Sequence, residues 1–484
     1  MEGVGSAPAT LSLLAIVVSL ATSGCRIGSA PTAPPAASTA ALLASLQTAL
    51  PGATVALLIA EADTGRELVS VNPDTLLVPA SNTKLFTTAA ALEMLGPTYR
   101  YATELRAVDV TETGKVDIVL IGGGDPTLGD PSGICIDALL SEIAEAVREA
   151  GICERINDLV VDDSWLGADR YCRDWLLGDV DFAYAAPVSA ASLNDNLLVI
   201  HMQATQDGVA VTSDLPYEID SGVRVAEGTN ITVNRIKPGE PVTIRGTISP
   251  GPGVDLYVPA DDPPLFWAGR LADGLESRGI HILGLPRAGP AGPGTSLRTW
   301  LSPSIAEIVR ETNKSSRNLW ADLLFQTLGK EIVGDGTFGG GAEAVALFLE
   351  RSGVRSGETS IVDGSGLART NLTTARAIMR VLLSMRRSPR RAEFEFSLPV
   401  AGIDGTIRRR FAGTLLEGRL AAKTGTLRHV NVLSGYMRGS RDLAFVMIVN
   451  GRLGAARDAT AAIDGFLVGI ALMIDPGMGA TGRR

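Results

Sequence analysis

Helical periodicity dominates the stretch LVPASNTKLFTTAAALEML, residues 77–95. Its apolar positions recur three or four residues apart, at Leu85, Ala89, Leu92 and Leu95. Gly96 and Pro97 then end the pattern, because neither residue favours a continuing helix. The sequence therefore predicts a helix with Ser81 at its N-terminus and Lys84 one turn later.

A second helical pattern follows Asn313 in the stretch NKSSRNLWADLLFQTLG. Its apolar side is formed by Leu319, Leu323, Leu324 and Leu328. Ser316 and Asn318 stand at the predicted entry of this helix, separated by Arg317. The pattern thus places two more polar side chains at the beginning of a helix.

Extended structure is predicted around Lys423, Thr424 and Gly425 in the stretch RLAAKTGTLRHVNVLSGYMRG. The residues that favour a strand are Thr426, Leu427, Val430, Val432 and Leu433. A hairpin turn is expected at Gly439-Ser440, and DLAFVMIVNG supplies the returning strand. A further hairpin, TVALLIAEADTGRELVSV, is expected to turn at residues 63–65 and to lie beside this one.

Ser81 and Lys84 form the candidate nucleophile and base. Residues three apart share a helical face, so the Lys84 amine can reach the Ser81 hydroxyl. Unpaired N–H groups and the positive end of the helix dipole favour a developing oxyanion at this terminus. A lysine can act as a base where burial or a nearby cation lowers its pKa from about 10.4. The ordered set S-x-x-K, S-x-N and K-T-G therefore points to serine acyl-transfer chemistry.

These motifs resemble those of serine D-alanyl-D-alanine carboxypeptidase/endopeptidases of the penicillin-binding protein 4 family, the low-molecular-mass class C penicillin-binding proteins. Further phrases carry the resemblance: LIGGGDPTL, VVDDSWLG, YAAPVSAASLNDN, DGSGLARTNL and LPVAGIDGTIRRRF. The resemblance implies an α/β (α+β) fold, in which a serine β-lactamase/transpeptidase-like domain has an antiparallel sheet flanked by helices. Inserted β-rich accessory domains interrupt that domain.

The motif spacing fits such an insertion. The distance along the chain from Ser81 to Ser316 is more than twice that from Ser316 to Lys423. Between them, residues 208–251 alternate apolar and polar positions between turn residues, which is typical of short antiparallel strands. We therefore predict a catalytic domain made of residues 45–97 and 295–484, with accessory domains at 98–294. The family likeness places Asp125 and Asp163 in the accessory part, where structural roles are expected.

The resemblance also implies the site roles. Ser81 attacks the penultimate carbonyl of a peptide that ends in D-Ala-D-Ala, Lys84 acts as the base, and Ser316 passes a proton to the leaving D-alanine. Asn318 holds the substrate, while Lys423, Thr424, Gly425 and Thr426 form the strand that binds it and its carboxylate. The backbone N–H groups of Ser81 and Thr426 form the oxyanion hole. Peptidoglycan stem peptides are the expected partners, and β-lactams the expected inhibitors.

The N-terminal segment predicts export. Residues 11–22 form an apolar run shorter than the roughly 20 residues of a membrane span, as in a signal peptide over residues 1–25. It ends in TSGC, which resembles a lipoprotein box with Cys25 as the lipidated residue, although no Lys or Arg precedes the run. Residues 26–44 read as a Pro/Ala-rich tether. A periplasmic or extracellular location with membrane attachment through the N-terminus is therefore expected.

Composition and charge exclude some kinds of partner and cofactor. The chain has 484 residues, a net charge of −10 and acidic residues that are scattered, so it lacks the basic stripe of a nucleic-acid partner. Its three histidines and four cysteines show no zinc spacing, and no metal or cofactor is expected. Beyond Cys25, Cys135, Cys153 and Cys172 suffice for one disulfide. His429 follows the K-T-G strand but is expected to be a non-catalytic residue.

Arg317 departs from the family, which commonly has aspartate at this position. The sequence predicts a cation near Lys84 and Lys423 that depresses the pKa of Lys84 further or alters substrate preference. Because the two flanking residues face the chemistry, Arg317→Asp is predicted to change acylation by no more than about tenfold.

Two alternatives differ from a peptidase. A β-lactamase on the same fold would commonly use an E-x-x-x-N segment, but no glutamate between the second and third motifs has asparagine four residues on. A non-catalytic penicillin-sensing or cell-wall-binding protein would not need all three motifs intact. Carboxypeptidase and endopeptidase action both remain open.

Overall fold

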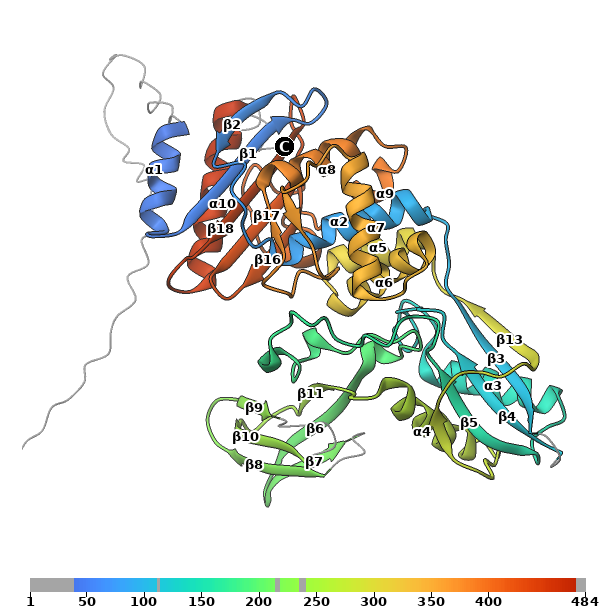
Figure 1. Ribbon diagram of the computed structural model, residues 1–484. Helices are drawn as coiled ribbons and strands as arrows, with labels where there is room; N and C mark the ends of the chain where they lie inside the picture. The colour runs from blue at the N-terminus through green and yellow to red at the C-terminus, as the bar shows by residue number, and fades with distance from the viewer. Residues whose placement is uncertain (1–38, 111–113, 214–217, 235–240, 476–484) are drawn as a thin grey trace, which may run out of the picture. The chain divides into compact units, whose positions relative to one another are not determined.

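A five-stranded antiparallel sheet carries the predicted K-T-G strand at its edge (Figure 1). The computed structural model describes residues 39–110, 114–213, 218–234 and 241–475. The strand order is β16-β17-β18-β1-β2, and β1 pairs with β18 from Thr54↔Asn450 to Glu61↔Leu443. The strands are β1 (Thr54–Glu61), β2 (Glu67–Val71), β16 (Leu420–Leu427), β17 (Val430–Met437) and β18 (Leu443–Asn450). The two predicted hairpins therefore lie side by side, as expected.

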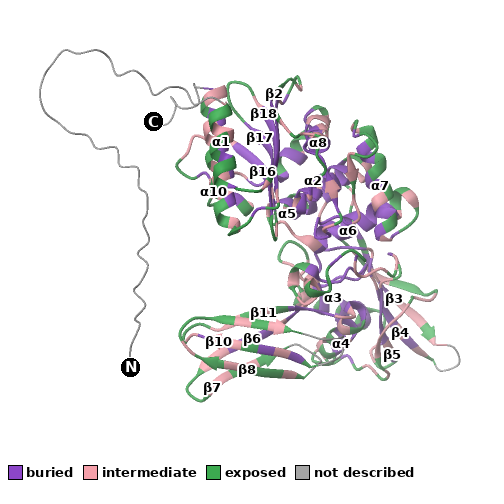
Figure 2. Cartoon of the chain, turned by 60° about the vertical axis from the view of Figure 1, so that its left-hand side comes forward, coloured by how far each residue is buried: buried purple, intermediate pink, exposed green. Residues whose placement is uncertain are grey.

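Both faces of this sheet are covered, because its central strands are apolar on both sides. Leu57 and Ile59 of β1 face a cluster that includes Leu467 of the C-terminal helix, whereas Ala56 and Leu58 face the cluster around Phe86. Alternation of side chains along a strand produces this division. The result is a helix–sheet–helix sandwich that buries the sheet (Figure 2).

The helices fall into two layers. On one face lie α1 (Thr39–Ala49) and α10 (Ala456–Ile474), and the other face is covered by a larger group. That group comprises η1 (Ala80–Asn82), α2 (Thr83–Ala90), η2 (Ala91–Leu95), α5 (Ile305–Lys314), α6 (Asn318–Leu328), η6 (Gly329–Val333), α7 (Phe338–Arg351), α8 (Ala375–Arg387) and α9 (Arg391–Ser397). The helices predicted after Ser81 and after Arg317 are confirmed. However, residues 319–328 of α6 are buried throughout, so α6 has no solvent-facing side.

Two local predictions are wrong. Helix α1 begins at Thr39, inside the predicted tether, because an Ala/Leu-rich stretch favours a helix there and buries Leu46 against α10. The extended stretch after Lys423 is two strands and not one. It breaks at Arg428 and His429, where His429 adopts a left-handed φ of 68° that permits a tight turn into β17.

Between the two catalytic stretches, the described residues form three further sheets. One has the order β12-β5-β4-β3-β13, and two smaller sheets have the orders β8-β10-β9 and β11-β6-β7. Their strands are β3 (Ala102–Val110), β4 (Lys115–Ile121), β5 (Ile156–Asp162), β6 (Leu197–Thr205), β7 (Gly208–Ser213), β8 (Ile219–Val225), β9 (Asn230–Asn234), β10 (Val242–Ile248), β11 (Val254–Pro259), β12 (Pro286–Ala288) and β13 (Thr295–Leu301). Helices α3 (Ile136–Glu149) and α4 (Pro263–Glu276) cover the first sheet.

The structure corrects the predicted insertion in two respects. Strand β13 pairs with β3, so residues 295–301 belong to the inserted sheet and the second catalytic stretch begins after Leu301. Strand β10 runs parallel to β8, so the small strands are not all antiparallel. Alternation of apolar and polar residues predicts that a strand has one buried face. It does not predict whether the strand runs parallel or antiparallel to its neighbour.

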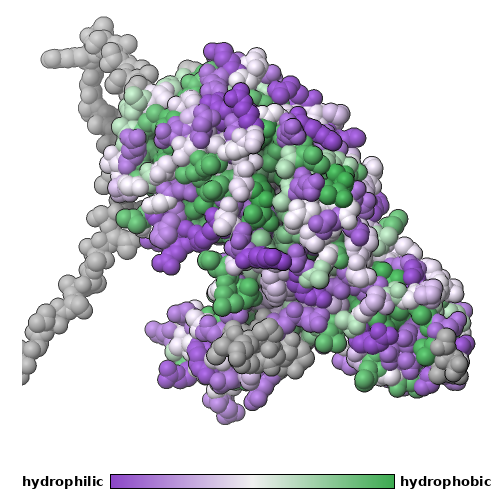
Figure 3. All heavy atoms as spheres, in the orientation of Figure 1, coloured by the Kyte–Doolittle hydropathy of each residue, from purple (hydrophilic) through white to green (hydrophobic). Residues whose placement is uncertain are grey.

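Remaining short elements complete the architecture. They are η3 (Leu177–Asp179), η4 (Ala183–Ala185), η5 (Asn194–Asn196), η7 (Gly405–Ile407), and the small strands β14 (Thr359–Ser360) and β15 (Leu372–Thr373). We call residues 98–301 the inserted segment. On the face drawn in Figure 3, hydrophilic and hydrophobic residues are interspersed over both the sandwich and the inserted segment. Among the described residues, no single helix is long and apolar enough to cross a bilayer; only the bent pair Asn318–Val333 and Phe338–Arg351 passes that test jointly.

Candidate active site

Ser81 lies in the short helical turn η1, immediately before α2. Ala80, the preceding residue, has a left-handed φ of 47°, which is uncommon for a residue other than glycine. The next residue, Asn82, donates its side-chain amide to the Lys423 carbonyl at 3.1 Å and so joins the turn to β16. The serine is therefore held at the junction between the helical layer and the edge of the sheet.

Lys84 is fully buried, and its amine lies within hydrogen-bond distance of three oxygen atoms. Its Nζ lies 3.1 Å from Ser81 Oγ, 2.7 Å from Asn318 Oδ1 and 2.6 Å from the Ser365 carbonyl oxygen. Burial disfavours the charged amine and lowers its pKa to about 8, although two buried carboxylates oppose this shift. The predicted contact between Lys84 and Ser81 is thus present, and the amine loses its proton at a lower pH than an exposed lysine does.

Those two carboxylates were not among the predicted site residues. Asp322 Oδ1 accepts the backbone N–H groups of Gly364 and Ser365 at 2.8 and 2.9 Å, and so fixes the loop whose carbonyl binds Lys84. Asp363 accepts four donors, among them the Trp175 indole at 2.9 Å. The signals available in the sequence were a lone aspartate in an otherwise apolar helix and the phrase DGSGLARTNL.

Ser316 and Lys423 form a second pair beside the first. Lys423 Nζ donates to Ser316 Oγ at 2.7 Å and to the Thr424 carbonyl at 3.0 Å. Burial and the neighbouring charge of Lys84 hold the pKa of Lys423 well below its ordinary value. Ser316 has a left-handed φ of 59°, a strained conformation for serine that aims its hydroxyl at this lysine.

Asn318 connects the first pair to the inserted segment. Its Oδ1 accepts the Lys84 amine, and its Nδ2 donates to the Tyr184 carbonyl at 2.8 Å. The amide therefore cannot turn over without losing one of these bonds. Asn318 thus links Lys84 to the Tyr184 backbone of the inserted segment.

Gly425 brings β16 against the Ser81 turn. A Cβ at this position would lie 2.9 Å from the Pro79 oxygen and 3.2 Å from the Ser81 nitrogen. Only a residue without a side chain permits so close an approach of the two backbones. The backbone around Thr426 can therefore stand beside the Ser81 N–H, as a two-donor oxyanion hole requires.

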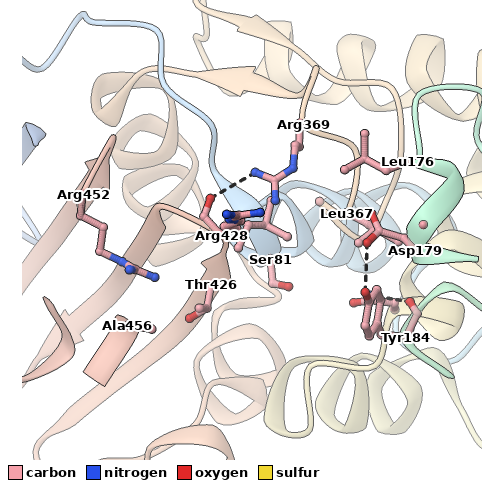
Figure 4. A pocket seen from close by; sticks show the side chains of 14 residues that line it. Ser81, Leu176, Asp179, Tyr184, Leu367, Arg369, Thr426, Arg428, Arg452 and Ala456 are labelled. Carbon is pink, nitrogen blue, oxygen red and sulfur yellow. Dashed lines mark hydrogen bonds between the residues drawn. The ribbon is translucent and has the colours of Figure 1, made fainter. Parts of the chain in front are cut away.

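Ser81 lines a cleft of 790 Å³, together with Asn318 and Thr426. Figure 4 shows Ser81 and Thr426 on one side, and Asp179 with Tyr184 of the inserted segment on the other. Other lining residues carry charge or apolar bulk: Leu176, Leu367, Arg369, Arg428 and Arg452. The inserted segment thus forms one wall of the cleft, which sequence patterning did not indicate.

The predicted residues are brought together with few exceptions. Thr424 pairs its hydroxyl with Thr406 Oγ1 at 2.8 Å, whereas Thr426 lines the cleft. Cys25, predicted to be lipidated, lies outside the described residues. His429 is exposed and binds the Arg452 carbonyl through Nδ1 at 2.9 Å, away from Lys84. Asp125 accepts the backbone N–H of Thr127, and Asp163 forms an ion pair with Arg170, both within the inserted segment.

Arg317 does not take the place predicted for it. Its guanidinium pairs with Asp130 at 2.6 Å and with Asp195, both on the inserted segment. The low pKa of Lys84 comes from burial, and that of Lys423 from burial and Lys84. The expectation of a third cation acting on the two lysines is therefore wrong, because oppositely charged groups draw the side chain toward the inserted segment.

The cysteines of the described residues are unpaired. Cys135, Cys153 and Cys172 are free thiols there, so the disulfide allowed by their number is not formed. The described part of the chain also has no cluster of three or more His, Cys, Asp and Glu side chains suited to a metal ion.

Comparison with known proteins agrees with this geometry. Residues 37–469 match the model of the D-Ala-D-Ala carboxypeptidase 3 (S13) family. The chain is 35% identical over 428 residues to a D-alanyl-D-alanine carboxypeptidase of Actinomadura sp. (strain R39), covering 81% of this chain and 77% of that protein. It is 26% identical over 406 residues to a D-alanyl-D-alanine carboxypeptidase of Haemophilus influenzae, covering 79% and 82%.

The fold also matches a solved structure. Penicillin-binding protein 4 of Haemophilus influenzae superposes with a TM-score of 0.78 at 24% identity, covering 89% of this chain and 99% of that one. At this identity the likeness speaks for the fold. It supports the α/β architecture of a transpeptidase-like domain with inserted sheets.

Proposed function

The chain belongs to the D-Ala-D-Ala carboxypeptidase 3 (S13) family, and from this premise we propose that Ser81 cleaves the amide after the penultimate D-alanine of peptidoglycan stem peptides. The reaction passes through an acyl-enzyme on Ser81 Oγ. The same serine would be acylated by β-lactams, whose strained amide carbonyl and nearby carboxylate resemble the substrate's terminus. The products are D-alanine and a shortened peptide, or two separated strands when the bond is a cross-link.

The hydrogen bonding of Lys84 carries this proposal. A neutral amine has two N–H donors and one lone pair. The two shorter contacts, to Asn318 Oδ1 at 2.7 Å and the Ser365 carbonyl at 2.6 Å, take the two donors. The lone pair is then left facing Ser81 Oγ at 3.1 Å. Neutral Lys84 is thus oriented to accept the serine proton as Oγ attacks.

Substrate docking follows from the sheet topology. Strand β16 is the edge strand of its sheet, and residues 399–401 bond only to its first half, so a peptide can add alongside its second half as a further strand. The scissile carbonyl would then lie between Ser81 and Thr426, whose N–H groups stabilise the oxyanion. Lys423, Thr424 and Thr426 would hold the terminal carboxylate, and the Asn318 amide the acyl side.

Departure of D-alanine needs a proton on its nitrogen. Ser316 Oγ accepts from Lys423 at 2.7 Å, so its own hydrogen remains available for the leaving amine. Lys423 can return a proton to Ser316. Deacylation reverses these roles: neutral Lys423, acting through Ser316, takes a proton from the attacking water, and protonated Lys84 returns its proton to Ser81 Oγ as the acyl bond breaks.

The cleft also indicates what kind of peptide fits. Asp179 and Arg369 line it with opposite charges, and Arg369 Nη1 donates to the Arg428 carbonyl at 3.2 Å. A substrate with both a positive and a negative group near the scissile bond would meet complementary partners. We therefore propose that the cleft prefers charged stem peptides to apolar ones.

Two substrates test the proposed function. Purified protein is incubated with a diacylated Lys-D-Ala-D-Ala tripeptide and with cross-linked muropeptides, and the products are identified by mass spectrometry. Release of D-alanine indicates carboxypeptidase action, whereas separation of the cross-linked chains indicates endopeptidase action. Turnover of neither substrate would favour a penicillin-sensing or cell-wall-binding protein. Rapid hydrolysis of penicillin with no peptide turnover would favour a β-lactamase.

The pKa of Lys84 predicts the acid limb of the pH profile. Below about pH 8 the amine is protonated and cannot accept the Ser81 proton. The acylation rate is therefore expected to rise about tenfold per pH unit below this value and to level off above it. Stopped-flow acylation by a fluorescent penicillin between pH 5.5 and 9.5 measures this limb. A flat profile across that range would show that Lys84 is not the titrating base.

Gly425→Ala is expected to slow acylation by about 100-fold, the size of effect seen when one oxyanion donor is lost. The added methyl group would meet the Pro79 oxygen at 2.9 Å and the Ser81 nitrogen at 3.2 Å, so β16 must move away from the serine. Gly465→Ala is the matched control, because a Cβ there meets nothing within 4 Å. Equal acylation rates for the two variants would contradict the assigned oxyanion hole.

We also propose that the protein is exported, with residues 1–25 as a signal peptide and Cys25 as the lipidated residue. The apolar run and the TSGC box support this. Mass spectrometry of the mature N-terminus tests it. A diacylated Cys25 at the new N-terminus would support lipid attachment to the membrane, and an intact Met1 would contradict export by this route.

A further inference from the structure

Arg317 joins the S-x-N motif to the inserted segment. Its Nη1 donates to Asp130 Oδ2 at 2.6 Å, its Nη2 donates to Asp195 Oδ2, and its Cζ lies 4.3 Å from the centre of the Trp320 ring. The side chain is only 22% exposed. A partly buried guanidinium held by two carboxylates and a ring is fixed far more firmly than a surface cation.

The Asp195 carboxylate is itself held in place. Its Oδ1 accepts the Trp320 indole N–H at 2.8 Å, so one carboxylate binds both Arg317 and the residue one turn later in α6. Asp195 is the middle one of three consecutive residues with left-handed φ values, 49°, 55° and 54°. The side chain of the third, Asn196, locks this turn by donating to the Pro187 carbonyl at 2.8 Å. The partner of Arg317 is therefore preformed.

Ser316 needs such support. A left-handed serine is strained and persists only where its surroundings hold it in that conformation. On one side, Lys314 is anchored to Asp404 at 2.6 Å and to the Leu398 carbonyl at 2.6 Å. On the other side, the anchor is Arg317. The strained residue is therefore held between two fixed cations, one anchored within the catalytic stretch and one anchored to the inserted segment.

We propose that Arg317 is a positioning residue for Ser316 and Asn318, and that Asp130 and Asp195 make the inserted segment a working part of the active site. This inference rests on the proposed function. Arg317 stands between the two residues in the chain, so its backbone cannot shift without moving the Ser316 hydroxyl, the Asn318 amide or both. Displacement of a reacting group by about 1 Å can cost 100-fold in rate.

The proposal replaces the expectation drawn from the sequence for Arg317→Asp. That change would place a third carboxylate beside Asp130 and Asp195, and like charges at this distance repel. We therefore expect it to reduce acylation by more than tenfold.

The test compares Arg317→Met with Arg245→Met. Arg245 also pairs with an aspartate, Asp220, but within the small sheet β8-β10-β9 of the inserted segment. For each variant, kcat and KM on the tripeptide, the acylation rate with fluorescent penicillin and the melting temperature are measured. Arg317→Met should lose about 10–100-fold in kcat and acylation rate, with KM within about threefold of wild type. Arg245→Met should behave as wild type.

A double-mutant cycle separates positioning from independent effects. Asp195→Asn keeps a side chain that tolerates the left-handed conformation but removes the charge. If the pair acts as a unit, the double variant Arg317→Met/Asp195→Asn should be no slower than the slower single variant, within about twofold. Multiplied losses, or an Arg317→Met rate within threefold of wild type, would overturn the proposal.

If Arg317→Met does not fold, two further variants test the positioning role of Arg317. Asp130→Asn and Asp195→Asn each leave Arg317 one carboxylate, and wild-type acylation by both would overturn the proposal. Slower acylation by either, with an unchanged melting temperature, would support it. Failure of the proposed function is distinguishable, because it appears as an inactive wild-type protein, whereas failure of the positioning role appears as an active Arg317→Met variant.

Discussion

Ser81→Ala is expected to abolish turnover and covalent labelling by penicillin, with a loss of at least about 10⁴-fold in kcat. The physical reason is that Ser81 Oγ lines the cleft and contacts the Lys84 amine, which can take its proton. Ser316 Oγ is hydrogen-bonded to Lys423, and Lys84 has its lone pair directed at residue 81. Mass spectrometry of the protein after incubation with penicillin, together with D-alanine release from the tripeptide, measures both losses.

Ser360→Ala serves as the matched control. Ser360 is an exposed serine in the short strand β14, and its replacement should leave labelling and turnover unchanged. An adduct of unchanged yield on the Ser81→Ala protein, mapped to another residue, would mean that the nucleophile has been misassigned.

Lys84→Met is expected to lower the acylation rate by about 10²–10⁴-fold, the range for loss of a general base. Methionine fills similar volume in this buried position but offers no lone pair of comparable basicity. It also leaves Asn318 Oδ1 and the Ser365 carbonyl without the donor that they share. Stopped-flow acylation and kcat on the tripeptide measure the effect, and the variant should lose the acid limb near pH 8.

Comparison with Ser316→Ala identifies the base. If Ser316, acting through Lys423, took the proton from Ser81, then Ser316→Ala would lose more in acylation than Lys84→Met. The opposite order is expected, because Lys84 Nζ contacts Ser81 Oγ whereas Lys423 Nζ contacts Ser316. Lys330→Met, which replaces a partly exposed lysine in η6, controls for the general loss of a positive charge.

Contacts between residues of the same helix or strand could be predicted from the sequence. Ser81 and Lys84 are one turn apart, so their contact follows from helix geometry alone. The helix ends at Gly96, the entry of α6 at Asn318 and the extended course of Lys423–Gly425 depend on local preferences, and these predictions are confirmed. Local rules failed where a competing local preference was overlooked, at the helix that begins at Thr39 and at the turn through His429.

The residues that form the wall of the cleft opposite Ser81 could be identified only from the tertiary structure. Asp179 and Tyr184 lie far along the chain from the motifs, and nothing in their local pattern indicates that they face Ser81. Likewise, the phrase DGSGLARTNL marked the family likeness, but only the folded chain shows the Ser365 carbonyl on Lys84 and Asp322 behind it. Such contacts depend on which loops the fold brings together.

The sequence by itself determined the chemical groups of the site, because helical and strand periodicities place neighbours in the chain at fixed offsets. What only the tertiary structure decided is the environment of those groups. Burial sets the pKa of Lys84, and the partners of Arg317 turn it away from the lysines. Both effects arise from residues hundreds of positions or a whole insertion away, since charge and desolvation act through space and not along the chain.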